Sequence, residues 1–287
     1  MRLPRSVDAL RLVEGRREIA EMIRRGPYER ITDAEVAVFS QFGDDGIIQY
    51  LINLVKPLPD SFIEIGVEDY SEANTRFLLM NNNWQGLLMD ASAAGLARLR
   101  VDPLFWRHAL RAERVFVTRE NINEVITRSG FKGEIGLLSI DLDGNDYWVW
   151  KAINCVQPVI AIVEYNSVFG PDRAITVPYD PEFVRRQAHY SNLYFGASIS
   201  GLQRLGQRLG YALVGSNSAG NNAYFVRSDR LVQPLRALAG SEAHRESRFR
   251  ESRDRNGKPT YLDGPARLEP MLGLQVWDVD TQALTTL

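Results

Sequence analysis

Carboxylates gather in the stretch LLSIDLDGNDYWVWKAI, directly after an apolar run. Asp141, Asp143 and Asp146 lie close together there, and IVEYNS brings Glu164 and Asn166 to the end of the next apolar run. Carboxylates this close stay ionised only beside a cation, hydrogen-bond donors or a divalent metal. Carboxylate and amide oxygens suit magnesium, manganese or calcium rather than zinc. The pattern therefore predicts a metal site with Asp141, Asp143, Glu164 and Asn166 as ligands.

A purely structural interpretation of the same stretch is also open. Asp143-Gly144-Asn145-Asp146 has the composition of a tight turn, with Asp146 as the cap of a following helix. This interpretation does not account for Glu164, which ends a wholly apolar run.

A second set of residues indicates a nucleoside. In FIEIGVEDYSEANT, Glu64 lies inside an apolar run and Gly66 follows it, and in LLMDAS the next run ends at Asp90. An acidic residue at that place can accept hydrogen bonds from both hydroxyls of a ribose, and its separation from Gly66, 90 − 66 = 24 residues, is near the roughly 20 typical of nucleoside-binding βαβ units. Asp90 can equally cap the helix that follows.

The loop after Gly66 does not suit a dinucleotide. The fingerprint G-x-G-x-x-G is absent, and Glu64, Glu68 and Asp69 would repel a pyrophosphate. A cationic or zwitterionic ligand fits this turn better.

A base for proton transfer is sought in the long connection YDPEFVRRQAHYSNLYFGAS. It carries His189 with Arg185, Arg186 and several tyrosines, which suit a polar, ring-shaped substrate such as a sugar. Tyr147 and Lys151 also form Y-x-x-x-K, the proton-transfer pair of short-chain dehydrogenases. That alternative, a nicotinamide-dependent sugar oxidoreductase, rests on this pair alone.

These residues need a parallel sheet to position them. Short apolar runs alternate with helical patterns, which is typical of βαβ units with helices on both faces of the sheet. Strands are expected at 62–65, 86–89, 115–117, 137–140 and 159–163, and helices at about 46–55, 73–82, 92–100, 121–129 and 146–153. A helix near 198–209 is followed by two runs, 211–214 and 222–226, joined by a Gly/Ser/Asn-rich turn, which favours an antiparallel hairpin.

The ends of the chain read as additions to this sheet. Leu10, Leu12, Val13, Ile19, Met22 and Ile23 predict an amphipathic helix that packs on the sheet domain or a second subunit. Residues 241–258 carry many charges of both signs, typical of a solvated helix or a mobile loop, with a flap over the site or a subunit contact as the alternative. We expect a helical extension at 1–39, a Rossmann-like domain at 40–230, and a charged segment and tail at 231–287 that pack back on it.

Charge and cysteine content limit the function classes. The 287 residues include 36 acidic and 34 basic side chains, a formal net charge of −2, so no basic field favours nucleic acid. One cysteine excludes an internal disulfide. Neither a signal peptide nor a membrane-spanning stretch is expected, and we predict a cytoplasmic protein. Its oligomeric state, including a homo-oligomer, stays open.

The chain resembles the class I S-adenosylmethionine-dependent methyltransferases, in particular the FkbM-type family associated with sugar and polyketide O-methylation. The resemblance covers roughly residues 40–227 and rests on E-x-G at Glu64–Gly66, Asp90, SIDLDGND, VEYN and the closing hairpin. It implies a seven-stranded, mostly parallel sheet. The first loop departs from the family in keeping only Gly66 of a more glycine-rich pattern.

The resemblance also implies where the cofactor lies: its methionine near Glu64 and Gly66, its ribose on Asp90 and its adenine near 118–121. The cofactor-binding residues expected on this basis are Glu64, Gly66, Asn74, Asp90, Ala91, Ser92, Asn121 and Asp141. Sugar-modifying members are commonly encoded with surface-polysaccharide genes, which implies a bacterial glycan acceptor.

The sequence therefore predicts an O-methyltransferase for a sugar or glycan hydroxyl. His189, Asp143 and Asp141 are the candidate catalytic residues: His189 or Asp143 would remove the hydroxyl proton, or a divalent ion on Asp141, Asp143 and Glu164 would lower the pKa of the hydroxyl and orient it. A catalytically silent, methyltransferase-like binding subunit is the alternative from another class, motivated by the missing glycine-rich loop and the charged segment 241–258.

Overall fold

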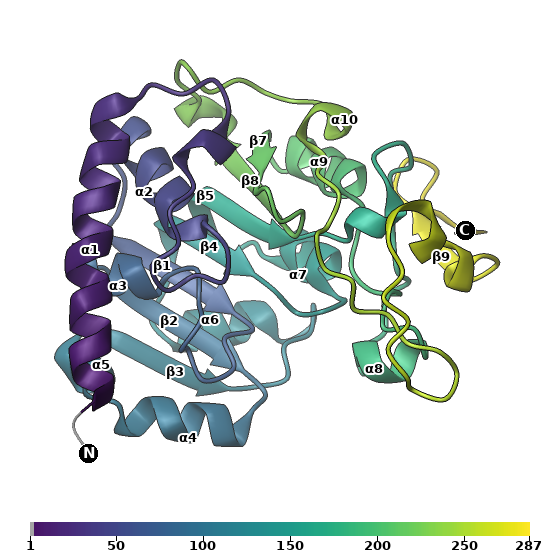
Figure 1. Cartoon of the computed structure of the whole chain (residues 1–287), viewed down its shortest axis with the longest axis horizontal. Helices are drawn as coiled ribbons and strands as arrows, with labels where there is room; N and C mark the ends of the chain where they lie inside the picture. Colours follow the sequence, from purple (N-terminus) through teal and green to yellow (C-terminus); the bar gives the residue numbers. More distant parts are fainter. Residues whose placement is uncertain (1–2) are drawn as a thin grey trace.

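Seven strands form one sheet in the order β3-β2-β1-β4-β5-β8-β7. In this computed structural model, which describes residues 3–287, the five strands β1 to β5 are parallel and only β8 runs against its neighbours β5 and β7 (Figure 1). The strands are β1 (Ser61–Ile65), β2 (Gln85–Asp90), β3 (Leu110–Arg114), β4 (Gly133–Ile140), β5 (Val156–Glu164), β7 (Tyr211–Ser216) and β8 (Asn222–Arg227). The predicted fold, a Rossmann-like sheet closed by an antiparallel hairpin, is confirmed.

The strand order reverses between β1 and β4, at the centre of the sheet. In open α/β sheets ligands bind at the carboxyl ends of the strands beside such a switch point. The central strands are buried almost throughout, because helices cover both faces. The carboxyl edge is therefore where the sheet can present polar groups.

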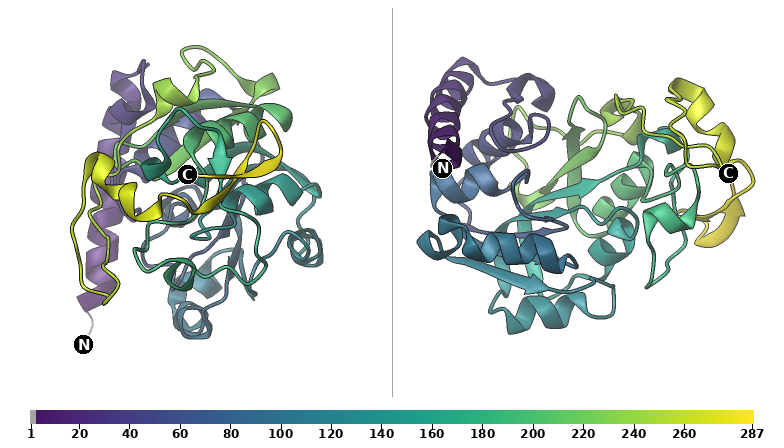
Figure 2. Two further views of the ribbon diagram at one scale, coloured as in Figure 1. Left: turned by 90° about the vertical axis from the view of Figure 1, so that its right-hand side faces the viewer. Right: turned by 60° about the horizontal axis from the view of Figure 1, so that its bottom comes forward.

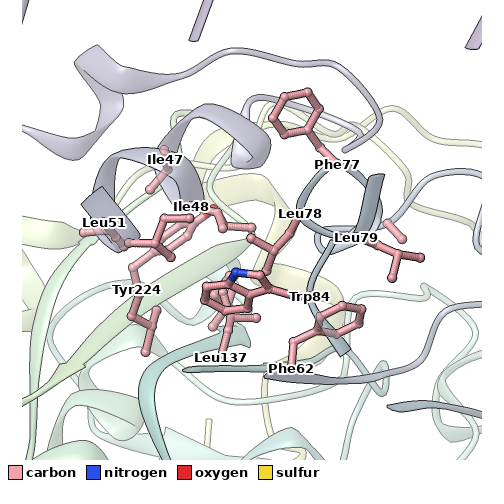
Figure 3. Packing of buried hydrophobic residues seen from close by; sticks show 14 of the residues in the cluster. Ile47, Ile48, Leu51, Phe62, Phe77, Leu78, Leu79, Trp84, Leu137 and Tyr224 are labelled. Carbon is pink, nitrogen blue, oxygen red and sulfur yellow. The ribbon is translucent and has the colours of Figure 1, made fainter. Parts of the chain in front are cut away.

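One face of the sheet lies under five helices: α1 (Leu3–Arg25), α2 (Asp44–Leu54), α3 (Arg76–Asn82), α4 (Ala93–Val101) and α5 (Pro103–Arg107). Their apolar side chains join those of the strands in one cluster. Figure 3 shows its centre, where side chains of α2 and α3 gather over the sheet around Trp84; those labelled are Ile47, Ile48, Leu51, Phe62, Phe77, Leu78, Leu79, Leu137 and Tyr224.

The other face is covered by α6 (Ile122–Arg128), α7 (Asp146–Ala152) and α9 (Ile199–Arg208). The aromatic rings of Trp150 and Phe225 pack together in this second cluster, with centroids 4.7 Å apart. Shorter helical turns connect the larger elements: η1 (Ile31–Ala34), η2 (Ser167–Phe169), α8 (Arg185–Ala188), η3 (Ser228–Arg230), α10 (Gly240–Ala243), η4 (Gly264–Arg267) and η5 (Glu269–Met271).

A second, three-stranded sheet was not expected from the sequence. Strand β6 (Ile175–Thr176), from the long connection after β5, pairs antiparallel with β9 (Gln275–Asp278), which pairs with β10 (Ala283–Thr286). The tail therefore packs back on the domain, and Figures 1 and 2 place it on the side of the molecule opposite α1. Between α10 and η4 the chain runs irregularly past α8 (Figure 1).

The predicted third strand, residues 115–117, is wrong in position: β3 ends at Arg114. As an edge strand with β2 as its only partner, β3 leaves much of its surface to solvent, so LRAER forms a strand without an apolar run. The apolar residues Val115, Phe116 and Val117 follow it as a loop.

The N-terminal helix α1 forms as expected and buries Ile19 and Met22 against the first cluster. Leu10 and Val13, which the pattern also assigned to the packed face, are exposed. No helix within residues 3–287 contains an apolar stretch of the length needed to cross a bilayer.

We expect Leu137→Ala to lower the free energy of unfolding by about 2–5 kcal/mol, because Leu137 on β4 is fully buried and its removal leaves a cavity in the first cluster. Urea denaturation followed by circular dichroism measures the change. Leu272→Ala is the matched control, since Leu272 is 60% exposed and its loss should change stability by less than about 0.5 kcal/mol. Equal effects of the two substitutions would contradict the assigned packing.

Candidate functional site

A cavity of about 560 Å³ opens at the carboxyl ends of β1, β2, β4 and β5. Its floor carries six of the residues singled out in the sequence: Glu64, Gly66, Asp90, Asp141, Asp143 and Glu164. Its walls come from more distant segments and include Phe42, Phe183, Arg185, Phe249 and Arg267. The strand-end carboxylates thus converge on one cavity, because the ends of adjacent parallel strands share one edge.

Gly66 allows the ends of β1 and β4 to approach closely. Its φ is +82°, and a Cβ at this position would lie 1.6 Å from the carbonyl oxygen of Asp141. Its amide also donates to the carbonyl of Met89 on β2 (2.8 Å). The glycine is required by contact between strand ends, in addition to any approach of a ligand.

Asp90 fixes the loop that follows Gly66. One oxygen of its carboxylate accepts from the amides of Val67 (2.9 Å) and Glu68 (2.8 Å), and the other accepts from the amide of Ser92 (2.6 Å). A carboxylate has about four acceptor positions. Asp90 therefore retains acceptor capacity on the side that lines the cavity.

Glu64 is buried and holds the start of α3. It accepts from the amides of Asn74 (2.8 Å) and Thr75 (3.1 Å) and from the hydroxyl of Thr75. Burial raises the pKa of Glu64 from 4.5 to about 7, since these donors offset only part of the lost hydration. The arrangement positions Asn74, whose amide donates to the Ser139 hydroxyl (3.1 Å), at the cavity wall.

Asp141, Asp143 and Glu164 form one acidic cluster, with a carboxylate oxygen of each within 4.8 Å of the others. Burial, followed by the charges of Asp143 and Asp146, raises the pKa of Asp141 to about 8. Burial and the Asp141 charge raise the pKa of Glu164 as well. Within residues 3–287 the Oε2 atom of Glu164 is buried without a hydrogen-bond partner. The cluster is thus short of positive charge or protons.

Arg185 supplies part of that charge. Its guanidinium donates to Asp143 (2.5 Å) and to the carbonyl of Asn192 (2.8 Å), and it stacks over the ring of Phe195 at 3.7 Å from the centroid. The sequence placed Arg185 in a substrate loop. The structure brings it to the acidic cluster, with Asp143 in the left-handed region at φ 54°.

The turn interpretation is right about the turn and wrong about the cap, because Asn145 is at the cap position of α7 and Asp146 is the first residue of the helix. The carboxylate of Asp146 accepts from the amides of Leu142 (2.8 Å) and Gly144 (3.0 Å) and holds the turn ahead of α7. Burial raises its pKa to about 7. The turn explains Asp146 and leaves the clustering of Asp141, Asp143 and Glu164 to be explained otherwise.

Asn166 is committed to the backbone, although it lines the cavity. Its amide nitrogen donates to the carbonyls of Leu193 (2.7 Å) and Phe195 (3.0 Å), and its oxygen accepts from the amide of Val168 (3.0 Å). With donors and acceptor engaged, Asn166 is removed from the metal ligands that we propose below.

His189, the expected base, does not line the cavity. Its Nδ1 is bonded to the hydroxyl of Ser191 (2.8 Å), and its ring packs on that of Tyr190. Sequence reasoning placed it in the right connection but could not determine which way the loop turns. We therefore do not carry His189 forward as a catalytic residue.

Two of the expected cofactor residues also lie outside the cavity lining. Ser92 caps α4 by accepting from the amide of Gly95 (3.0 Å). Asn121 braces its own loop, accepting from the amide of Thr118 (2.9 Å) and donating to the carbonyl of Phe116 (2.9 Å). The cavity wall on this side is formed by residues 115–117 instead.

The dehydrogenase alternative loses its geometric basis. Tyr147 is buried, and its hydroxyl has no partner within the described residues, while Lys151 lies over the ring of Trp148. Neither residue lines the cavity.

Sequence reasoning missed the loop at 38–42. Oδ2 of Asp45 accepts from the amides of Val38, Phe39 and Ser40, at 2.7–2.8 Å, so the next two residues face the cavity. Phe42 there packs edge to face on Phe249, with ring centroids 5.0 Å apart. The available signal was the pair Asp44-Asp45 at the start of a helix, because a carboxylate there can accept hydrogen bonds from nearby backbone amides.

Beyond α10 the charged segment 241–258 forms no helix and is largely exposed, in keeping with the loop interpretation. Its residues Ser247, Phe249 and Glu251 line the cavity, as in the flap alternative. Hydrogen bonds from the amide of Ser247 to the hydroxyl of Ser167 (3.0 Å) and from the amide of Arg253 to the carbonyl of Ser191 (3.2 Å) join the segment to the domain.

The sequence matches no protein-family model and no curated protein. Solved structures similar to the chain include the small RNA methyltransferase HEN1 (16% identity, TM-score 0.36), of which it spans only 26% while 67% of this chain is covered. A second is an O-methyltransferase from Bacillus cereus in complex with SAH, with 13% identity and a TM-score of 0.37, where the match covers 75% of this chain and 88% of that one. A third is the O-methyltransferase TomG from Streptomyces achromogenes in complex with SAM, with 13% identity and a TM-score of 0.38, where the match covers 75% of this chain and 87% of that one. The fold of this chain is established by its own strand order and pairing.

The buried Glu64 predicts a pH dependence of stability. A carboxyl whose pKa is higher in the folded than in the unfolded chain binds its proton more tightly when folded, so its contribution is present at low pH and lost as pH rises from 4.5 through 7. We expect the stability of the wild type relative to Glu64→Gln to fall by on the order of 2 kcal/mol between pH 5 and pH 8.

Urea denaturation at the two pH values measures this difference. Glu72→Gln is the control, because Glu72 is exposed and should leave the pH dependence of the wild type unchanged. A difference between wild type and Glu64→Gln that stays constant with pH would show that Glu64 does not titrate in this range.

Proposed function

We propose that the chain is an S-adenosylmethionine-dependent O-methyltransferase that acts on a hydroxyl of a sugar or glycan. The observation that carries this proposal is the convergence of Gly66, Asp90 and the acidic cluster on one cavity at the switch point of the sheet.

The β1–β2 half of the cavity suits the cofactor. Asp90 keeps acceptor capacity for ribose hydroxyls, and Glu64 and Asn74 lie where the methionine part would be. The apolar loop 115–117 offers a surface for the adenine, next to the 118–121 stretch that the family resemblance implied. In this half the carboxylates of Glu64, Glu68 and Asp90 favour a sulfonium cation and disfavour a phosphate.

The β4–β5 half suits the acceptor. When bound, S-adenosylmethionine supplies a methyl group on a sulfonium, so the acceptor oxygen must lie in line with the breaking carbon–sulfur bond and lose its proton. Asp141 and Asp143 both reach this half, and we assign proton acceptance to this pair. Arg185 holds Asp143 in place through its short ion pair.

A sugar is the acceptor that fits the walls best. Aromatic side chains of Phe42, Phe183 and Phe249 stand among polar ones, and such mixed surfaces bind the apolar faces and the hydroxyls of sugar rings. The resemblance to sugar-modifying methyltransferases supports the same class.

A divalent ion on Asp141, Asp143 and Glu164 is a further part of the proposal. Three oxygen ligands within 4.8 Å and the unpartnered Oε2 of Glu164 fit a magnesium or manganese ion. Arg185 already neutralises one carboxylate, so the ion would add to an existing cation. Bound there, it would supply a Lewis acid for the acceptor hydroxyl.

We expect S-adenosylhomocysteine to bind in calorimetry and Asp90→Asn to weaken binding at least about tenfold, equal to about 1.4 kcal/mol, because the ribose would lose its charged acceptor. Asp69→Asn is the matched control: Asp69 bonds Ser71 and does not line the cavity. Absence of binding to the wild type, with or without magnesium, would refute the cofactor assignment. Binding without turnover on any glycan acceptor would favour the silent-subunit alternative.

We expect one manganese ion to bind per chain, and Glu164→Gln and Asp143→Asn each to weaken its binding at least about tenfold through loss of a charged ligand. Calorimetry with manganese measures this, and Glu251→Gln, which removes a cavity carboxylate outside the cluster, should have no effect. If metal content is unchanged in Asp143→Asn and turnover is indifferent to chelator, the metal part of the proposal is wrong while the methyltransferase part stands.

A further inference from the structure

Arg267, in η4, is a buried cation at the cavity wall. Its side chain lines the cavity, although the residue is only 7% exposed. Its Nη1 donates a long hydrogen bond to the carbonyl of Ser247 (3.4 Å), and its Nε is buried without a partner. Within residues 3–287 no carboxylate lies within 4.0 Å of its guanidinium.

Burying a guanidinium in this way costs free energy unless a hydrogen-bond acceptor or an anion pairs with it. Removing a guanidinium from water without pairing it costs several kcal/mol, by the effective penalties seen in proteins, and an unmade donor adds to that. Burial, and then the charge of Arg185, lower the pKa of Arg267. Arg185 is paired with the carboxylate of Asp143 and the carbonyl of Asn192. Of the two arginines at the cavity, Arg267 is therefore the one without a carboxylate partner among the described residues.

Two acidic residues, Glu251 at the cavity wall and Glu246, whose charge acts on Arg267, do not form an ion pair with it within the described residues. Glu251 lines the cavity but lies within reach of Arg253 (3.7 Å) and of the Asn192 amide (3.4 Å). Glu246 is exposed, and it makes no ion pair in the described part of the chain. Beside the buried Nε, the Nη2 atom of this cavity-lining residue also has no hydrogen-bond partner within residues 3–287, and no protein carboxylate pairs with the guanidinium there.

Arg267 belongs to the acceptor half of the cavity. The turn η4 packs beside η2, which directly follows the end of β5, and leads into Leu268 and Met271 of the cluster under the second sheet. Asp90 lies at the end of β2, and β1 and β4 separate β2 from β5 in the sheet. The free guanidinium is thus at the far end of the cavity from the residues assigned to the ribose.

We propose that the acceptor carries an anionic group, a carboxylate or phosphate on the sugar, that Arg267 binds while the reacting hydroxyl lies at Asp141 and Asp143. This inference rests on the proposed function and narrows its substrate class to acidic sugars. A guanidinium fork matches both anions through paired N–H···O bonds, which a neutral hydroxyl cannot match in charge.

The experiment compares matched sugars on the full chain, with and without saturating S-adenosylhomocysteine. The probes are methyl β-glucuronide against methyl β-glucoside, and glucose 6-phosphate against glucose, with inorganic phosphate as a third arm; calorimetry gives each Kd. We expect at least one acidic probe to bind at least about tenfold more tightly than its neutral counterpart. Arg267→Met should remove that difference, and Arg267→Lys should recover only part of it, since it keeps the charge without the fork.

Arg248→Met is the matched control, because Arg248 is exposed on the neighbouring charged segment 241–258 and does not line the cavity. It should leave every affinity unchanged. Urea denaturation of each variant checks that it folds. If Arg267→Met does not fold, the comparison of Arg267→Lys with the wild type is the test.

Four results would overturn the proposal: equal binding of acidic and neutral probes, no binding of acidic probes up to about 20 mM, inorganic phosphate binding as tightly as glucose 6-phosphate, or a loss of S-adenosylhomocysteine affinity in Arg267→Met. The last would assign Arg267 to the carboxylate of the cofactor. Failure of the wild type to bind S-adenosylhomocysteine would refute the proposed function separately, because the anion arm is also read without cofactor.

Discussion

The close contact between the ends of β1 and β4 is the constraint on which the site depends. The carbonyl oxygen of Asp141 occupies the space that a Cβ at Gly66 would fill, so only glycine lets the two strands end side by side. This contact sets the position of the Asp141 carboxylate relative to the loop held by Asp90. A site built on two strand ends in van der Waals contact has little freedom to widen, because packed interiors yield only at appreciable cost.

The electrostatic character of the cavity follows from that packing. Carboxylates brought to one buried edge cannot all remain ionised without partners, which is why the pKa values of Asp141 and Glu164 rise. Some partners come from the backbone, as for Glu64 and Asp146, and one comes from Arg185. The carboxylates with backbone partners hold loops in place, whereas the cluster without enough partners is where a ligand has most to offer.

The sequence predicted well what depends on strand ends. Apolar runs located β1, β2, β4 and β5, and the rule that parallel strands end at one edge was enough to bring Asp90, Asp141 and Glu164 together. The sequence-based prediction failed where hydrogen bonding determines the orientation of a side chain, or where strand pairing between distant segments determines the structure. The amide of Asn166 turns to the backbone, His189 faces away, and β3 is an edge strand without an apolar run. Arg267 lines the cavity from a segment ahead of β9, and no local pattern predicts the pairing of β9 with β6.

The pairing of β6 with β9 has a consequence for how this protein can change over evolutionary time. It fastens the far end of a segment that starts at α10 and crosses the half of the cavity proposed for the acceptor, while the half proposed for the cofactor is formed by strand ends and the loops that follow β1 and β3. Substitutions or length changes between residues 244 and 263 can remodel one half without disturbing the strands that form the other. The architecture thus places the strand ends and a replaceable wall segment in different parts of the chain, as proteins that carry variable loops on a rigid scaffold commonly do.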